Sequence, residues 1–222
     1  MRPALPIFRP AVRFLSFAAC ALLLAGCARV YDVKVDAMRN PEVHPGHSYR
    51  ITVKDHGREV GDAKQQRAAA LVRKALAGHG MYEAEDPADA EVSVEVDYAV
   101  GAQRTVAQST PVDDQYYIFD RYGGRIPSRP VLTSEVTVQT VYEKKLTIVA
   151  RENVPPEDGR ERPPRELWRV EVRVDDAKDS VDEVLPVLVG AALDHIGTDS
   201  AQARSKRISD KDEPVNFVKG GS

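Results

Sequence analysis

The sequence predicts an α+β domain built as a two-layer sandwich, with a mixed, mostly antiparallel sheet of about five strands and two amphipathic helices on one face. Two observations predict this fold class. Several short segments alternate apolar and polar residues, which is typical of strands with one face in a core and the other in water. Two longer segments repeat apolar residues every three or four positions, as amphipathic helices do.

The first elements along the chain are two strands and a helix. Segments 29–36 (RVYDVKVD) and 49–55 (YRITVKD) alternate strictly and predict short strands. Asp62 is placed to cap the following helix, because its carboxylate can accept amide hydrogens at the helix N-terminus. The helix ends at Gly78 or Gly80. Its apolar stripe consists of Ala68, Leu71, Val72, Ala75 and Leu76.

Three more strands follow. Segment 90–100 alternates without a break, so its valines and Tyr98 face a core. The residues that face water are Glu91, Ser93, Glu95 and Asp97. Segment 168–174 does the same, and Trp168 is expected to anchor the core. The proline-rich connection before it predicts a hairpin loop. Between them runs an even-numbered apolar register, namely Val136, Val138, Tyr142, Leu146 and Ile148.

A second helix is predicted within segment 179–197, DSVDEVLPVLVGAALDHIG. Ser180 and Glu183 have the spacing of a capping box. Pro186 would lose a hydrogen bond if the helix began at Val181, so the helix begins one turn later or is kinked. Its apolar positions are Val181, Val184, Leu185, Leu188, Ala192 and Ile196.

The N-terminus has the pattern of a secretory signal. Three arginines without an acid precede an apolar run from Phe14 to Leu24, about half of the roughly 20 residues that a membrane-spanning helix needs. The next four residues resemble the bacterial lipobox: Leu24, Ala25, Gly26 and Cys27. This resemblance implies cleavage before Cys27, a diacylglycerol thioether on its sulfur and an N-acyl chain. Ala28 in place of Asp favours the outer membrane, by resemblance to enterobacterial sorting.

The rest of the chain is consistent with a lipid-tethered domain. Cys20 lies in the signal peptide, residues 1–26, so the mature chain keeps only Cys27 and has no intramolecular disulfide or thiolate metal site. Removal of three arginines takes the formal charge from -3 to -6, which argues against nucleic-acid binding. Residues 27–197 are expected to form one domain, and residues 198–222 a disordered polar tail.

The order of these features resembles the bacterial envelope lipoproteins of the domain-of-unknown-function four-one-three-six family. The residues that carry the resemblance are Gly80, Pro87-Ala88-Asp89 before the strand at Val92, and Leu167-Trp168-Arg169. The chain departs from the family pattern at Glu143-Lys144-Lys145, where a glycine is usual, and in a wider proline-rich turn. The resemblance implies the fold and an envelope location, and leaves the molecular function open.

Segment 103–130 is expected to be a long connection with a cluster of aromatic residues before Gly123-Gly124. Long loops are often functional, and exposed aromatics can stack on a ligand or a partner surface. The alternative is that these side chains fold back over the open sheet face and complete the core. The aromatic residues are Tyr116, Tyr117, Phe119 and Tyr122.

Other residues offer weaker candidates for chemistry. His44, His47 and His56 could offer imidazoles to a metal, but the chain has no HExxH motif, so no metal site is predicted. His79 and His195 are expected to serve the ends of their helices. Adjacent carboxylates, at Glu85-Asp86, Asp113-Asp114 and Asp175-Asp176, are normally solvated.

The function expected from the sequence is that of a non-catalytic outer-membrane lipoprotein whose domain faces the periplasm and binds an envelope partner or supports envelope integrity. No catalytic residue and no cofactor beyond the acyl chains on Cys27 are predicted. Two alternatives remain open. One is a carrier or accessory subunit for a lipid or small hydrophobic ligand, held under the aromatic loop. The other, more distant, is a cell-wall hydrolase.

Overall fold

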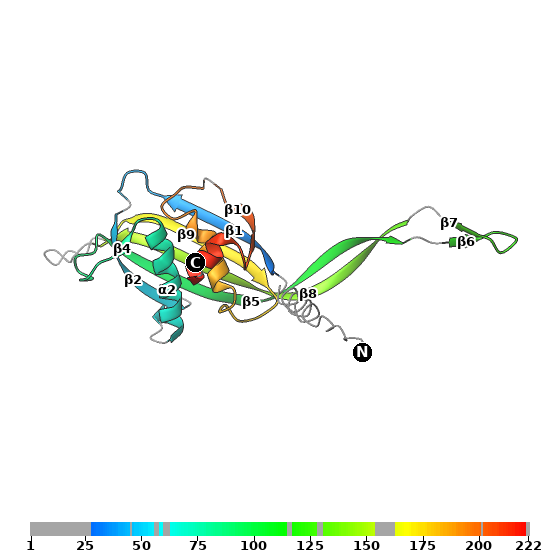
Figure 1. Cartoon of the computed structure of the whole chain (residues 1–222), viewed down its shortest axis with the longest axis horizontal. Coiled ribbons are helices and arrows are strands. Elements are labelled where there is room, and N and C mark those ends of the chain that lie inside the picture. The colour runs from blue at the N-terminus through cyan, green and yellow to red at the C-terminus, as the bar shows by residue number, and fades with distance from the viewer. Residues whose placement is uncertain are drawn as a thin grey trace, which may run out of the picture.

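One open sheet of eight strands forms the centre of the described fold (Figure 1). The computed structural model describes residues 28–44, 46–55, 58–59, 63–114, 117–127, 131–153, 163–200 and 202–220. The strands are β1 (Val30–Arg39), β2 (Ser48–Asp55), β3 (Arg58–Glu59), β4 (Tyr82–Glu83), β5 (Val92–Asp114), β8 (Val131–Glu152), β9 (Glu166–Asp176) and β10 (Arg204–Ser209). A separate two-stranded sheet pairs β6 (Tyr117–Phe119) with β7 (Arg125–Pro127).

The strands of the large sheet lie in the order β10, β1, β9, β8, β5, β2 and β3, with β4 beside β2. β2 runs parallel to β5 and to β4, and every other recorded pair is antiparallel. The prediction of a mixed, mostly antiparallel sheet is therefore confirmed. The expected number of about five strands was too low, because two-residue strands and the last strand give no alternating pattern long enough to recognise.

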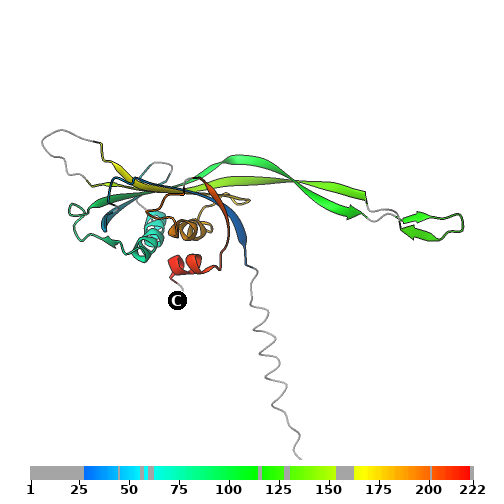
Figure 2. The same cartoon turned by 90° about the horizontal axis from the view of Figure 1, so that it is seen from above.

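In the described part of the chain, helices α2 (Ala63–Gly78), α3 (Leu185–Leu193) and α4 (Glu213–Lys219) all cover the same face of the sheet (Figure 2). The predicted stripe of α2 is buried as expected. The helix closes with Gly80 at a positive φ of 75°, where Gly80 N donates to Ala77 O and Met81 N donates to Leu76 O. Trp168 is 1% exposed and anchors the core, opposite Ala150 of β8 and beside the valines of β9, as predicted. The Asp62 cap and the connection at 154–162 lie outside the described residues.

Helix α3 begins at Leu185, with Pro186 in its first turn, as the cost of an internal proline predicts. The expected capping box is wrong. The residue at the N-cap is Val184, which makes no side-chain cap, while Ser180 Oγ accepts a hydrogen bond from Asp182 N at 3.3 Å. The chain therefore makes a local turn at Ser180 before the helix starts.

The described residues of the C-terminal segment, 202–220, are folded, which corrects the expected disordered tail at 198–222. β10 pairs with β1, and α4 packs on α3 with Val215 and Val218 buried. Gly190 of α3 permits this approach, because a Cβ there would lie 2.9 Å from Val215 Cγ2 and 3.0 Å from its backbone. All but one of the residues of α3 are buried, so the helix needs a layer on both sides, and α4 supplies the outer one.

The opposite face of the sheet is charged and open to water. A row of ion pairs crosses four strands, in which Glu95 of β5 lies 2.8 Å from Lys54 of β2 and 3.3 Å from Arg151 of β8. Arg151 reaches Glu166 of β9 at 4.0 Å, and Arg169 contacts the same carboxylate at 2.7 Å. This face matches the half-solvated sheet predicted from the alternation in segment 90–100.

Candidate functional site

The most distinctive feature is an arm of two long strands that projects from one end of the sheet (Figures 1 and 2). The arm comprises residues 103–142. Its shaft pairs β5 with β8 from Gln103 opposite Tyr142 to Asp114 opposite Val131, and β6 and β7 lie at its far end. A register shift between Val100 and Gln103 marks the point where the arm leaves the sheet. Twelve residues of extended strand give the shaft a length of about 40 Å.

The arm corrects the expectation of a long irregular connection at 103–130. Alternation was not recognised there because both faces of a two-stranded ribbon meet solvent, so neither face is required to be apolar. The predicted even-numbered register of β8 is right about which side chains share a face. It is wrong about burial, since Leu146 and Ile148 lie in the core whereas Val136 and Val138 are 62% and 65% exposed.

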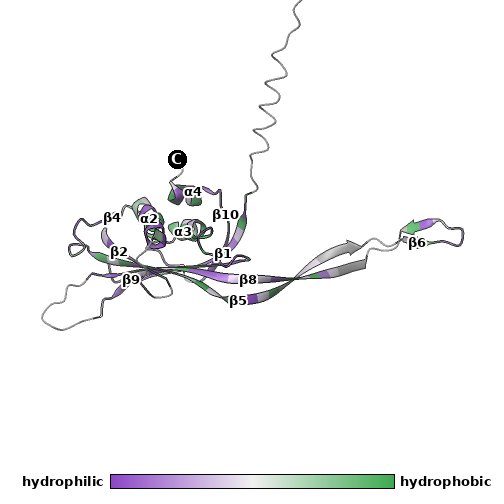
Figure 3. Cartoon of the chain, turned by 90° about the horizontal axis from the view of Figure 1, so that it is seen from below, coloured by the Kyte–Doolittle hydropathy of each residue, from purple (hydrophilic) through white to green (hydrophobic). Residues whose placement is uncertain are grey.

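One face of the shaft carries no charged residue from Gln103 to Ser109 of β5 and from Val136 to Tyr142 of β8. Residues that oppose one another in an antiparallel pair share a face. The pairs on this face are Gln103 with Tyr142, Thr105 with Thr140, Ala107 with Val138, and Ser109 with Val136. This face continues the core-facing side of β8 into the part of the strand that no described helix covers. Figure 3 shows hydrophobic residues in the arm. We call this surface the uncharged arm face.

The tip of the arm is a tight turn organised by Asp120. Its Oδ1 accepts hydrogen bonds from Tyr122 N at 2.9 Å and Gly124 N at 2.6 Å. Gly123 has a φ of 78°, and a Cβ at Gly124 would lie 2.6 Å from Asp120 Oδ2, so both glycines are required. Phe119 and Tyr122 are 64% and 93% exposed.

These exposures contradict the alternative in which the aromatic residues cover the sheet and complete the core. Phe119 and Tyr122 lie at the tip, far from the helices and the sheet face (Figure 1). The tip therefore lies about one shaft length away from the sheet face that these aromatic residues would have to cover. Tyr116 and the side chain of Tyr117 lie outside what the structure describes.

A buried ion pair lies where the arm joins the sheet. Lys144 has no exposed side-chain surface, and its Nζ lies 2.7 Å from Oδ2 of Asp176, which is 6% exposed. Asp176 Oδ1 also accepts hydrogen bonds from Arg29 at 3.2 Å and from Ala177 N at 3.0 Å. From the sequence, Lys144 was expected only as part of a departure from a family pattern, and Asp175-Asp176 were expected to be solvated. Lys144 lies in the core-facing register of β8, and this position was the sequence signal that its ammonium would need a buried acidic partner.

Arg29 connects this pair to the start of the described chain. Its guanidinium lies 3.4 Å from Glu183 and 5.5 Å from the centre of the Tyr31 ring, in a cation–π contact. Burial raises the pKa of the Tyr31 hydroxyl, and the nearby Asp176 adds to this, while Arg29 opposes it. We call Arg29, Lys144 and Asp176 the arm root. Cys27 and the rest of the lipobox, Leu24 to Gly26, lie outside the described residues, two positions and more before Arg29.

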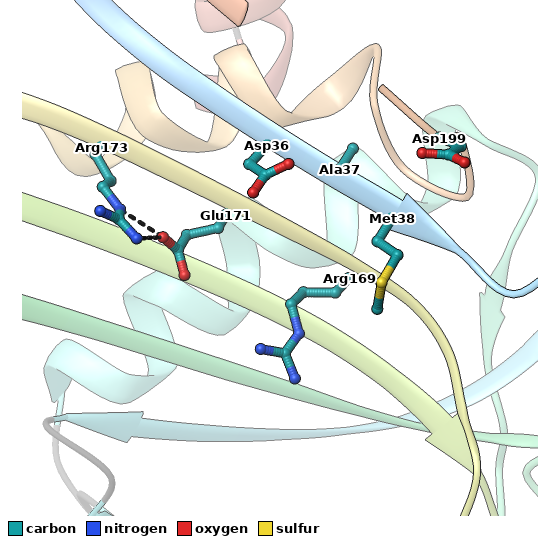
Figure 4. Close-up of a pocket in the computed structure, with 7 residues that line it drawn as sticks. All are labelled: Asp36, Ala37, Met38, Arg169, Glu171, Arg173 and Asp199. Carbon is teal, nitrogen blue, oxygen red and sulfur yellow. Dashed lines mark hydrogen bonds and ion pairs between the residues drawn. The ribbon is translucent and has the colours of Figure 1, made fainter. Parts of the chain in front are cut away.

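A hollow of about 410 Å³ lies on the charged face between β1 and β9 (Figure 4). Arg173 pairs with Glu171 inside it, and Arg169 is bonded to Glu166 at its edge. Its charged groups are thus largely used in pairs along β9. Its lining consists of Asp36, Ala37, Met38, Arg169, Glu171, Arg173 and Asp199.

The candidate histidines do not converge. The rings of His44 and His47 lie 5.9 Å apart on an exposed turn, and His56 is outside the described residues. Among the residues that are described, no group of three His, Cys, Asp or Glu side chains is close enough to hold a metal. His79 Nε2 contacts the Leu193 carbonyl. Burial lowers the pKa of His195, and the charge of Lys206 adds to this effect.

Comparison with known proteins gives only distant similarities. Neither a family model nor a curated protein matches the chain. Among solved structures, a PDZ domain protein from Parabacteroides distasonis is 10% identical with a TM-score of 0.39. The match covers 85% of this chain, which spans 41% of that protein. The PelC dodecamer from Paraburkholderia phytofirmans is 11% identical with a TM-score of 0.38, over 76% of this chain and 99% of that one.

A DUF4136 family protein from Bacteroides thetaiotaomicron is 12% identical with a TM-score of 0.33, over 65% of this chain and 81% of that one. In the parts of the chain that are described, no helix has both the length and the apolar character to cross a membrane.

Proposed function

We propose that this chain is a non-catalytic, lipid-anchored protein of the outer membrane that faces the periplasm and binds an envelope partner through its arm. The observation that carries the proposal is the shaft, a two-stranded ribbon with an uncharged face that nothing in the described part of the chain covers. By contrast, the charged side chains on the open sheet face of the body form ion pairs with one another.

A ribbon of two strands is only marginally stable in water by itself. Among the described residues no third strand pairs with the outer edges of the shaft, because β9 stops pairing with β8 at Tyr142 and β2 stops pairing with β5 at Tyr98. Such edges accept an added strand, and an uncharged face accepts a packed side-chain layer. A partner that supplied either would stabilise the arm, which is why we assign binding to this element.

The arm root supports an anchored arrangement. Arg29 is bonded to Asp176 at the base of the arm and lies two residues after Cys27. Lipidation of Cys27 would therefore hold the base of the arm against the membrane, and acyl chains bind bilayers with about 0.8 kcal/mol per buried methylene. Incorporation of a labelled fatty acid into the wild type and its loss in Cys27→Ser tests this part of the proposal.

The other functional classes have less support. The carrier hypothesis placed a ligand beneath the aromatic residues, but Phe119 and Tyr122 stand at the tip of the arm, away from the core. The hydrolase hypothesis required histidines that meet an acid in a cleft, and His44 and His47 instead occupy an exposed turn.

The binding proposal is tested by photo-crosslinking in intact envelopes. A photoreactive amino acid replaces Val138 in the full-length lipoprotein, and a control variant carries it at Tyr82, which is 61% exposed on β4 of the body. We expect one stoichiometric adduct from position 138 and none of that size from position 82. Val136→Asp, which places a charge on the uncharged arm face, should abolish the adduct.

Equal adducts from both positions would show that exposure alone determines crosslinking, and the assignment of binding to the arm would be wrong. If the adduct still forms in Val136→Asp, the uncharged arm face is not part of the interface. Val30→Asp is the matched control, because Val30 is an exposed valine of the body, and it should leave the adduct intact.

A further inference from the structure

The tip of the arm exposes apolar side chains on both faces of its hairpin and in its turn. Phe119 lies opposite Arg125 in the tip hairpin, and Ile126 follows Arg125, so Phe119 and Ile126 project from opposite faces. Tyr122 stands between them in the turn. The exposed fractions are 64% for Phe119, 93% for Tyr122 and 50% for Ile126. A protein groove usually covers one face of a hairpin, whereas a lipid layer surrounds an inserted tip on all faces.

Two of the three charged residues within 117–127 are arginines, which suits contact with an anionic surface. Arg121 and Arg125 are exposed beside the aromatic residues. The nearest described acid, Asp120, already accepts hydrogen bonds from the amides of Tyr122 and Gly124 and serves the turn. Aromatic rings next to arginines are the composition that membrane proteins place at the level of lipid headgroups.

Hydrogen bonds within the chain already fix the turn at the arm tip in the absence of a membrane. The bonds to Asp120 and the hydrogen bond from Gly123 N to Asp120 O at 3.0 Å fix the backbone between Phe119 and Arg125. Binding therefore requires little further ordering of the chain.

The structure also limits how deeply the arm can enter a membrane. In the described residues the outer edges of the shaft are unpaired, and hydrocarbon does not tolerate unpaired backbone groups. Glu135 of the shaft adds an exposed charge near the tip. Insertion is thus restricted to the tip and to the depth of the headgroups.

We propose that the arm tip, residues 117–127, binds the headgroup region of a bilayer that contains anionic phospholipid. Together with the anchor at Cys27, which rests on the proposed function, this gives the protein two membrane contacts separated by the shaft. The arm then lies along the membrane surface, with the uncharged arm face available to a partner.

The test uses the full-length lipoprotein in vesicles of phosphatidylcholine, with or without phosphatidylglycerol. Tyr122→Cys provides the only free thiol of the mature chain if the Cys27 sulfur is bonded to lipid, and it carries an environment-sensitive fluorophore. Tyr82→Cys, at an exposed tyrosine of the body, is the matched control. Uptake of fluorophore by the wild type would show that Cys27 is not lipidated. That result contradicts the proposed function without deciding the behaviour of the tip.

We expect the fluorescence at position 122 to rise several-fold in vesicles with phosphatidylglycerol, and to be quenched by nitroxides near the headgroups. Position 82 should not change. Arg121→Gln should lower the docking equilibrium about fivefold. The proposal is overturned if position 122 does not respond, if phosphatidylcholine alone gives the same rise, or if the rise depends on protein density. The last result would assign the tip to a second copy of the chain.

Discussion

Replacement of Lys144 by methionine removes the buried ammonium of the arm root and leaves the Asp176 carboxylate with Arg29 and the Ala177 amide as partners. Breaking a buried ion pair by deleting one partner costs about 3–5 kcal/mol. Arg29 remains 3.2 Å away, although it is partly exposed, so we expect a loss near the lower limit, about 3 kcal/mol. With a urea m-value of about 2 kcal/mol/M, the unfolding midpoint then falls by about 1.5 M.

The reverse substitution, Asp176→Asn, should be more damaging. It leaves the Lys144 ammonium without a counter-charge at a position with no exposed surface, and we expect a loss of about 4–5 kcal/mol. The double variant Lys144→Met/Asp176→Asn removes both charges and should be more stable than Asp176→Asn alone, because the Lys144 ammonium no longer stays buried without a counter-charge.

The control for this series is Arg207→Met. Arg207 and Asp32 form an ion pair of 3.1 Å in which both side chains are more than three-quarters exposed, so its loss should barely move the midpoint. If Lys144→Met costs no more than Arg207→Met, burial does not strengthen the pair and the reasoning is refuted. A double variant whose cost equals the sum of the single losses would show that the two charges act independently.

Three further predictions concern the core, the charged face and the arm. Gly190→Ala should lower stability by about 1–3 kcal/mol in thermal unfolding, because its Cβ meets the Val215 backbone at 3.0 Å, and an unchanged midpoint would contradict the close approach. Burial raises the pKa of Glu95, but Lys54 and Arg151 together outweigh it and lower the pKa overall. The stabilisation is therefore present above the usual value of 4.5 and is lost as the pH falls through the lowered pKa; Glu95→Gln should flatten this acid limb in urea titrations. Val136→Asp should leave the thermal midpoint within error of the wild type, since its site is exposed, and a large drop would mean that the arm packs against the body.

The body of the fold was largely predictable from the sequence because its strands have one face in a core. In β1, β5 and β9 the alternation of valines with charged residues follows directly from that burial. The helix at 63–78 was predictable for the same reason, since one stripe of it packs on the sheet.

The arm and the C-terminal segment were missed for different physical reasons. The shaft has solvent on both faces, so threonine, serine and glutamine replace the apolar half of the pattern, and strand pairing alone defines it. The last helix contributes only Val215 and Val218 to the core, which is too few to show a period. The sequence of α3 did contain an indication, because a run of nine residues without a polar side chain cannot leave one side in water.

The continuity of β5 and β8 through body and arm has a mechanical consequence. Both strands are central in the sheet, between β2 and β9, and both continue into the shaft past the register shift at Val100 to Gln103. Tension applied at the tip along the arm therefore loads many of the hydrogen bonds between β5, β8 and their neighbouring strands in shear at the same time. These bonds do not break one after another. The body should therefore resist a pull along the arm more strongly than a pull that separates β5 from β8 at the tip.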